Sequence, residues 1–306
     1  MLSLLTRTKS FRDPWVGHPV LNRRWQLHRH RMQLAERLCG WRRKLRPALD
    51  LPDGSLQRLR RDGVVAVPNA LSHDQFLAIQ AEAEEAVAAA ARRQPLPSNH
   101  REGFLPKQPF HGGFDRFDGG TLNRFVGLDP GVMPQTLRLC HDQRLNAFSR
   151  AVIGCPMHPR KLEIYLTVHG EETRTPDLQK ELHRDTFFRA IKFWLFLRPV
   201  RSEDGPFEYV PGSHQLTPAR LAWEQDKANR AIATGRQPDC SGSFRIREQD
   251  LKDLNLPEPV SFECDANTLV LADVFGFHRR GSALPGRQRL SIYGWNRPYP
   301  FLPITW

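Results

Sequence analysis

The residues best suited to chemistry are a histidine and an aspartate two places apart, in His183-Arg184-Asp185, ahead of a long aromatic and aliphatic run. In an extended strand, residues i and i+2 project to the same side, so this imidazole and this carboxylate point into one space. His278, which follows another expected strand, offers a third ligand. Two histidines and one carboxylate form the facial triad of non-haem Fe(II) oxygenases, which leaves positions open for a cosubstrate and O₂. The alternative is that His183 and His278 are ordinary hydrogen-bonded residues, because an H-x-D pair also arises by chance.

Two further residues indicate a cosubstrate. Arg289 opens an expected strand over 289–295, and Ser291 lies on the same face two residues later. A planar guanidinium matches both oxygens of a carboxylate, and the hydroxyl adds a third hydrogen bond. The pair therefore suits one end of a dicarboxylate such as 2-oxoglutarate, whose 2-oxo acid end would chelate the iron.

The elements that must position these residues are mostly short strands separated by Gly, Pro and Asp turns. Helices are expected from Ser72, which begins a capping box with Gln75, and over 135–153. Residues 99–134, rich in Gly, Pro and phenylalanine, predict a long loop or lid whose rings, with Trp194, line the cavity or pack in the core. The strands are expected over 63–68, 161–168, 190–199, 207–210, 268–274 and 289–295. This order indicates a mainly β fold with flanking helices around a double-stranded β-helix (jelly roll) core, interrupted by an insertion at about 218–259.

The segment 203–214, with the sequence EDGPFEYVPGSH, resembles the N-G-P-x-x-x-x-P-G-S-H segment of the phytanoyl-CoA dioxygenase family. The likeness extends from about Leu56 to the C-terminus and implies a jelly-roll core that binds Fe(II) and 2-oxoglutarate. Carried over by position, the resemblance places the iron ligands at His183, Asp185 and His278, and the 2-oxoglutarate arginine at Arg289. It also matches Trp194 to a tryptophan in the strand after H-x-D.

This chain departs from the family pattern at two positions. The family often has a serine two places after the distal histidine, where this chain has Arg280, so Ser291 gains importance as a cosubstrate contact. Asp204 replaces the asparagine of the turn, where the two residue types are nearly equivalent. His214 is expected to be a turn or cavity-rim residue, since three better ligands exist.

Positive charge is concentrated at the N-terminus. Residues 1–50 carry twelve Lys or Arg against three acidic residues, which is most of the chain's formal charge of +12. We therefore divide the chain into a basic amphipathic arm, 1–50, and a dioxygenase domain, 51–306. An apolar helical face recurs through the basic residues of the arm. It consists of Leu27, Leu34, Leu38, Trp41 and Leu45.

This arm has three interpretations. The apolar face packs on the main domain, or residues 21–46 bind an anionic membrane surface, where each basic side chain contributes about 1 kcal/mol. Nucleic-acid binding ranks third, because no nucleic-acid-binding motif accompanies the charge.

No apolar stretch approaches a membrane span of about 20 residues, and the start of the sequence does not resemble a secretory signal. The five scattered cysteines do not form a disulfide or zinc pattern. We expect a cytoplasmic protein, peripheral on the inner face of the cytoplasmic membrane if the arm binds lipid.

The resemblance implies a hydroxylase but leaves several substrates open. A lipopolysaccharide sugar precursor of the Kdo type suits a basic arm, because such a substrate is anionic and lipid-borne. A soluble acyl-CoA or a small metabolite is the alternative. A non-catalytic binding module on the same fold is the alternative from another class, against which stands the presence of all three ligands and the arginine.

Overall fold

The computed structural model describes residues 2–96, 105–157, 161–171 and 173–303. Its helices are α1 (Pro19–Trp25), α2 (Leu27–Leu45), α3 (Ser55–Asp62), α4 (His73–Arg93), α5 (Pro134–Arg138), α6 (Gln143–Ile153), α7 (Pro218–Thr234) and α8 (Glu248–Asp253). Its strands are β1 (Val64–Val67), β2 (Leu105–Phe110), β3 (Gly113–Asp118), β4 (Thr121–Gly127), β5 (Leu162–Val168), β6 (Ile191–Phe196), β7 (Phe207–Tyr209), β8 (Val260–Phe262), β9 (Thr268–Asp273), β10 (His278–Arg280) and β11 (Gln288–Asn296).

The strands form two antiparallel sheets. The larger has the order β1-β9-β6-β11-β5-β4-β3-β2, and the smaller has the order β10-β7-β8. His183 adds an antiparallel bridge to His278 at the edge of the smaller sheet. From β5 to β11 the chain therefore passes back and forth between the two sheets, which is the winding of a double-stranded β-helix. The prediction of a mainly β fold with flanking helices and a jelly-roll core is confirmed.

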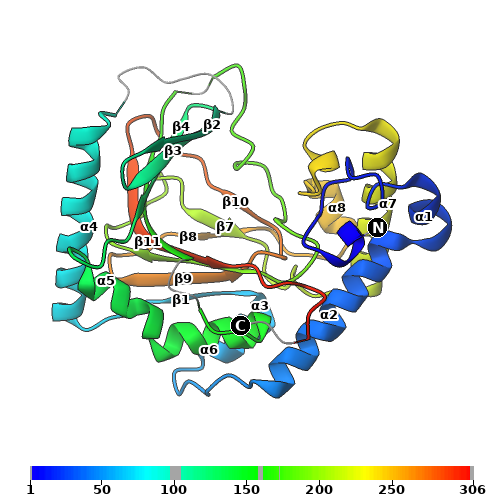
Figure 1. Cartoon of the computed structure of the whole chain (residues 1–306), viewed down its shortest axis with the longest axis horizontal. Coiled ribbons are helices and arrows are strands. Elements are labelled where there is room, and N and C mark those ends of the chain that lie inside the picture. Colours follow the sequence, from blue (N-terminus) through cyan, green and yellow to red (C-terminus); the bar gives the residue numbers. More distant parts are fainter. Residues whose placement is uncertain (1, 97–104, 158–160, 172, 304–306) are drawn as a thin grey trace.

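The two faces of the larger sheet have different neighbours. In β6, Ile191, Phe193 and Leu195 share one buried cluster with α3, α4 and α6, while Lys192 and Trp194 point the other way and line a cavity. Figure 1 shows α3 and α6 beneath this sheet, with the smaller sheet above it. The alternation of β-strand side chains thus sends the apolar residues to the helices and the functional residues into the barrel.

Two expectations about chain conformation were wrong. Residues 105–127 form the antiparallel strands β2, β3 and β4, where we expected a loop or lid. Prolines at 106 and 109 are tolerated there because β2 is an edge strand. The helix expected over 135–153 is broken into α5, a 3₁₀ turn at Leu139–His141 and α6. The break occurs because the Asp142 carboxylate accepts a hydrogen bond of 2.8 Å from Leu145 N and caps a new helix.

The N-terminal segments pack against the insertion between β7 and β8. Phe11 and Val16 are buried in one cluster with Trp223 and Phe244 of the insertion, and Met32 of α2 shares another buried cluster with Leu221 of α7. In Figure 1, α1 and α2 extend along the side of the molecule that carries α7 and α8. Residues 2–45 are therefore part of the packed structure.

Helix α2 packs through a different face from the apolar one that the sequence indicated. Its buried residues are His28, Arg31, Met32, Ala35, Cys39 and Arg42. Leu34, Trp41 and Leu45 remain 42%, 46% and 53% exposed. The interpretation that this apolar face packs on the main domain is wrong for these three residues. The error has a physical reason, since Arg31 and Arg42 are buried by donating to backbone carbonyls, which a pattern of apolar residues does not register.

A buried ionic cluster joins the triad segment to the insertion. Glu224 of α7 is fully buried and accepts hydrogen bonds from Arg184 at 2.6 and 2.7 Å and from Arg220 at 3.0 and 3.2 Å. Its Oε2 lies 3.1 Å from His28 Nε2, and burial lowers the pKa of that imidazole. One carboxylate therefore compensates two buried guanidinium groups.

Removing the charge of Glu224 is expected to destabilise the fold strongly. Glu224→Gln leaves Arg184 and Arg220 without a counter-charge, and breaking a buried pair in this way costs about 3–5 kcal/mol. The matched change Asp226→Asn removes an exposed carboxylate of the same helix, and we expect a loss of about 0–1 kcal/mol. Urea unfolding of both variants measures the difference. Equal stabilities would show that the cluster does not hold the insertion in place.

Candidate functional site

The three predicted metal ligands converge in the structure. His183 Nε2 and His278 Nε2 lie 3.7 and 3.8 Å from Asp185 Oδ1, and all three side chains are buried. His183 and Asp185 come from the segment before β6, and His278 opens β10. The backbone bridge between His183 and His278 brings the two distant segments together, with reciprocal N–H···O bonds of 2.9 and 3.0 Å.

Each histidine presents the nitrogen that a metal needs. His183 Nδ1 lies 2.7 Å from the carbonyl oxygen of Glu181, and His278 Nδ1 lies 3.0 Å from that of Gly276. Because a carbonyl oxygen only accepts, Nδ1 carries the hydrogen in both rings and Nε2 keeps its lone pair toward Asp185. The backbone contacts thus orient both rings as the supporting contacts of metal-binding histidines do.

The charge states also fit a metal. Burial, and then the neighbouring His278, hold the pKa of His183 well below its usual value, and burial lowers the pKa of His278 to about 4. Burial acts to raise the pKa of Asp185, but Lys192 and Arg297 outweigh it and hold that pKa well below its ordinary range. At neutral pH the group is two neutral imidazoles and one carboxylate, the forms that bind a divalent cation.

The three ligand atoms lie close enough together to face one cation. Both Nε2 atoms are within 3.8 Å of Asp185 Oδ1, and all three atoms lie within 4.8 Å of one another. Histidine and carboxylate donors with an open side suit Fe(II). The residues therefore fit the metal that the sequence predicts.

A cavity of about 290 Å³ opens beside these ligands, and both Trp194 and Arg289 line it. The ring of Trp194 lies between those of Phe207 and Tyr293, at centroid distances of 4.6 and 5.8 Å. Arg289, in β11, is buried, and its side chain has no hydrogen bond or ion pair with the described part of the chain, with Nε fully enclosed. Burial, and then Arg280, lower the pKa of Arg289 to about 10, so it is charged at neutral pH. An unpartnered guanidinium in this cavity suits a carboxylate ligand.

The remaining predicted residues have the following positions. Ser291 is buried on the same strand face as Arg289 but does not line the cavity. Of the phenylalanines expected to line the cavity, Phe125 does so, whereas Phe104 lies outside the described residues.

His214 is buried away from the cavity, with Nε2 3.1 Å from the carbonyl oxygen of Arg60, and it lies against Gly63. Gly63 has a φ of 80°, and a Cβ there would come within 2.4 Å of His214 Nδ1, so only glycine fits.

Arg280 lines the cavity, but its guanidinium is already hydrogen-bonded to other residues of the protein. It donates 2.6 Å hydrogen bonds to Asp177 Oδ2 and Asn123 Oδ1 and lies 3.3 Å from the hydroxyl of Tyr165. Opposite charges around it raise its pKa despite burial. Arg280 therefore serves as part of the cavity wall, and Arg289 is the guanidinium that is available to a ligand.

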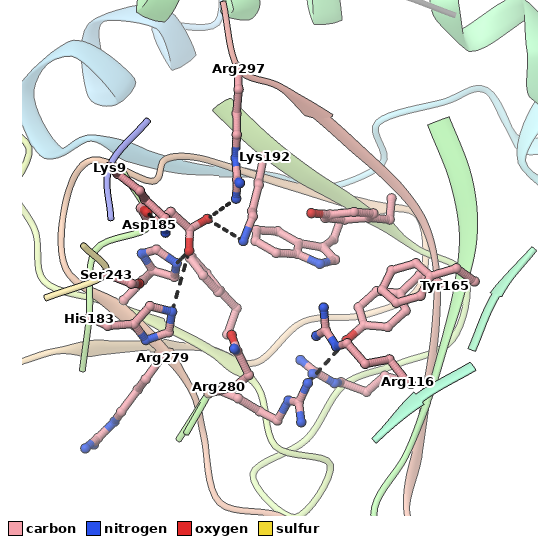
Figure 2. Close-up of a pocket in the computed structure, with 17 residues that line it drawn as sticks. Lys9, Arg116, Tyr165, His183, Asp185, Lys192, Ser243, Arg279, Arg280 and Arg297 are labelled. Carbon is pink, nitrogen blue, oxygen red and sulfur yellow. Dashed lines mark hydrogen bonds and ion pairs between the residues drawn. The ribbon is translucent and has the colours of Figure 1, made fainter. Parts of the chain in front are cut away.

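Sequence reasoning missed three cations near Asp185. Lys192 Nζ and Arg297 Nη2 lie 2.6 and 2.9 Å from Asp185 Oδ2, and Lys9 Nζ donates to the Asp185 carbonyl at 2.6 Å. Figure 2 shows all three around this aspartate. The position of Lys192 could have been predicted from the sequence, because a lysine two places before Trp194 in an apolar strand must share the face of that tryptophan. Lys9, whose pKa burial lowers to about 8, had none, since only tertiary folding brings the N-terminal segment here.

These features define a jelly-roll oxygenase with a site for a divalent metal and a carboxylate cosubstrate. The family model of phytanoyl-CoA dioxygenase matches residues 59–263, and the chain belongs to this family. The predictions of an enzyme, a dioxygenase that depends on Fe(II) and 2-oxoglutarate, are thereby confirmed at the level of the family. The match ends before His278 and Arg289 and begins after Lys9.

Solved structures give more distant similarities. AviO1 from Streptomyces viridochromogenes Tue57 is 18% identical, with 82% of this chain and 97% of that chain covered and a TM-score of 0.47. HygX from Streptomyces hygroscopicus, with nickel and 2-oxoglutarate bound, is 18% identical over 80% of this chain and 87% of that chain, with a TM-score of 0.43. EctD from S. alaskensis is 16% identical over 80% and 76%, with a TM-score of 0.47. No curated protein sequence matches the chain.

Proposed function

We propose that this chain hydroxylates an anionic substrate, with iron held by His183, Asp185 and His278 and with 2-oxoglutarate bound to Arg289. The observation that carries the proposal is the pairing, in one cavity, of three converging ligand atoms with a buried guanidinium that has no partner among the described residues. Trp194 bounds the cosubstrate space as an apolar wall. Ser291 lies on the same strand face as Arg289 but outside the cavity lining, and we propose its hydroxyl as a further hydrogen-bond partner of the distal carboxylate.

The protein's part in the reaction is binding and orientation. Iron and 2-oxoglutarate, when bound, supply the oxidation in which O₂ gives one atom to succinate, formed with CO₂, and the other to the substrate. His183 and His278 offer lone pairs fixed by their backbone contacts, and Asp185 offers Oδ1 while Lys192 and Arg297 hold Oδ2. Phe125, Trp194, Phe207 and Tyr293 supply the aromatic part of the cavity wall.

The charge of the cavity supports an anionic substrate. Seven cations line the cavity, and four carboxylates pair with them, which leaves an excess of three positive charges. These carboxylates are Asp185, Asp118, Asp177 and Glu208. Iron and 2-oxoglutarate carry opposite charges of equal size, so their binding leaves this excess unchanged. The lining cations are Lys9, Arg116, Lys192, Arg279, Arg280, Arg289 and Arg297.

The finer proposal is a Kdo-type sugar of a lipopolysaccharide precursor, reached at an anionic membrane surface. Leu34, Trp41 and Leu45 lie along one exposed stripe of α2, and Arg37 and Lys44 are exposed beside it. An apolar stripe bordered by basic residues is typical of helices that lie in a membrane interface. No helix in the described residues is long and apolar enough to cross a membrane. A soluble acyl-CoA or small metabolite is the alternative substrate.

The experiment that tests the function is incubation of the full chain with Fe(II), ascorbate, labelled 2-oxoglutarate and a lipid or metabolite extract. We expect release of labelled CO₂ together with a product heavier by one oxygen atom. Labelled O₂ identifies the source of that atom. Absence of 2-oxoglutarate decarboxylation from protein that retains iron would favour a non-catalytic binding module.

The membrane proposal gives a separate prediction. The full chain should co-sediment with anionic vesicles, more weakly as salt is added, because the basic side chains act through a field screened over about 8 Å at physiological ionic strength. Replacing Leu34, Trp41 and Leu45 together by serine should abolish most of this binding with only a small fall in melting temperature, since about half of each side chain is exposed. Replacing the exposed Leu77 of α4 by serine is the control and should have no effect. A full chain that ignores anionic vesicles at low salt would contradict the proposal.

A further inference from the structure

Three cations surround a single carboxylate at the metal end of the cavity. Lys192 and Arg297 share Asp185 Oδ2, while Lys9 has as its hydrogen-bond partner the neutral carbonyl of the same residue. Figure 2 shows these side chains approaching Asp185 from one side, with His183 on the other. We call Lys9, Lys192 and Arg297 the cationic subsite.

The charges of the cationic subsite are not balanced by the protein. Asp185 neutralises one of the three positive charges. The side chain of Lys192 is only 15% exposed, and Lys9 is half-buried. The Nε atom of Arg297 is buried and has no hydrogen-bond partner within the described ranges of the chain, so one donor of this guanidinium is unsatisfied there. The distal carboxylate of 2-oxoglutarate has Arg289 as its own partner, so the cosubstrate does not account for the excess. Buried cations of this kind are costly without an anion, which indicates that a ligand supplies one.

The N-terminal segment is built to hold Lys9 in place. The buried guanidinium of Arg31 in α2 donates to the carbonyl oxygens of Leu4, Thr6 and Thr8 at 3.0, 3.2 and 2.8 Å. On the other side of Lys9, Phe11 N donates to the carbonyl oxygen of Cys240 at 2.9 Å. The ring of Phe11 stacks on Phe244 at a centroid distance of 5.6 Å. Lys9 is thus anchored on both sides.

We propose that the cationic subsite binds a carboxylate of the substrate, carried close to the carbon that is oxidised. A guanidinium with two flanking ammonium groups offers converging donors to a carboxylate, whose single negative charge offsets one of the two positive charges that Asp185 leaves uncompensated. The inference rests on the proposed function and names its substrate class, a sugar acid or other compact organic acid. A free acyl-CoA fits less well, because its thioester is neutral and its phosphates lie far from the acyl carbons. Two members of the subsite, Lys9 and Arg297, lie outside the family match.

The test compares an acid with its neutral ester. Calorimetry is performed without oxygen on the full chain loaded with Fe(II) and 2-oxoglutarate, with Kdo and Kdo methyl ester as probes. We expect Kdo to bind at least about tenfold more tightly than the ester, the factor that about 1.4 kcal/mol represents. Equal affinities, or no binding of either probe, would overturn the inference.

Substitutions in the cationic subsite test whether it causes the preference for the acid over the ester. Lys9→Met and Arg297→Met should each remove most of the difference between acid and ester, whereas Lys9→Arg should keep it. Arg12→Met, which removes an exposed charge three residues from Lys9, should leave it unchanged. An acid preference that survives Lys9→Met would also overturn the inference.

Release of CO₂ from labelled 2-oxoglutarate is measured in air on the same wild-type preparation. Decarboxylation without acid preference contradicts the subsite alone, and loss of both contradicts the proposed function as well.

Discussion

Asp185→Ala and His183→Ala are each expected to lose stoichiometric Fe(II) binding at micromolar metal. Each change removes one of three ligand atoms and leaves two, which do not hold iron against water. We expect binding to weaken by at least about 100-fold, more than the roughly 10- to 100-fold typical of residues that only support a ligand. Metal content after gel filtration, measured by atomic absorption, gives the stoichiometry.

The two variants differ in their effect on folding. Asp185→Ala also leaves Lys192 and Arg297 without their shared carboxylate, so its melting temperature should fall. His183→Ala removes a neutral ring and should lose iron with less loss of stability. Lys192→Met provides the control for a supporting residue and should weaken iron binding without abolishing it. Stoichiometric iron in both His183→Ala and Asp185→Ala would disprove the ligand assignment.

The core of the site was predictable because it follows from local geometry. The two-residue period of a strand places His183 beside Asp185, and Arg289 on the face of Ser291, before any fold is known. The segment Glu203–His214 added the family and, with it, the jelly-roll order. The convergence of His278 on the other two ligands needed the fold, because the bridge between His183 and His278 joins strands 95 residues apart in sequence.

The other features of the fold and the site depend on tertiary contacts, which sequence patterns do not reveal. Residues 105–127 were expected to be a loop because Gly and Pro disfavour regular structure, but pairing with β5 makes β4, and through it β3 and β2, part of the sheet. The buried face of α2 includes Arg31 and Arg42, whose burial depends on distant carbonyl partners. Lys9 enters the cavity only because Arg31 and the insertion hold the N-terminal segment beside it.

Arg289→Lys is expected to raise the 2-oxoglutarate concentration needed for half-maximal decarboxylation by about tenfold or more. The substitution keeps the charge but loses the planar fork, so about 1.5 kcal/mol of a charge-assisted pair is lost. The cavity amplifies the effect, because the buried guanidinium has no protein partner identified in the described chain and a shorter lysine side chain withdraws its charge from the ligand.

Arg287 provides the matched control for this prediction. It lies two residues earlier on the same chain segment, but its guanidinium is 44% exposed and pairs with Glu203 at 3.1 Å and Asp204 at 2.6 Å. Arg287→Lys should therefore change the 2-oxoglutarate requirement little, while leaving the turn intact through the retained charge. The comparison is made by initial rates of labelled CO₂ release, with iron content matched between the variants. If Arg287→Lys were the more damaging of the two, the cosubstrate contact would lie two residues earlier in the chain, and the assignment of Arg289 would have to be abandoned.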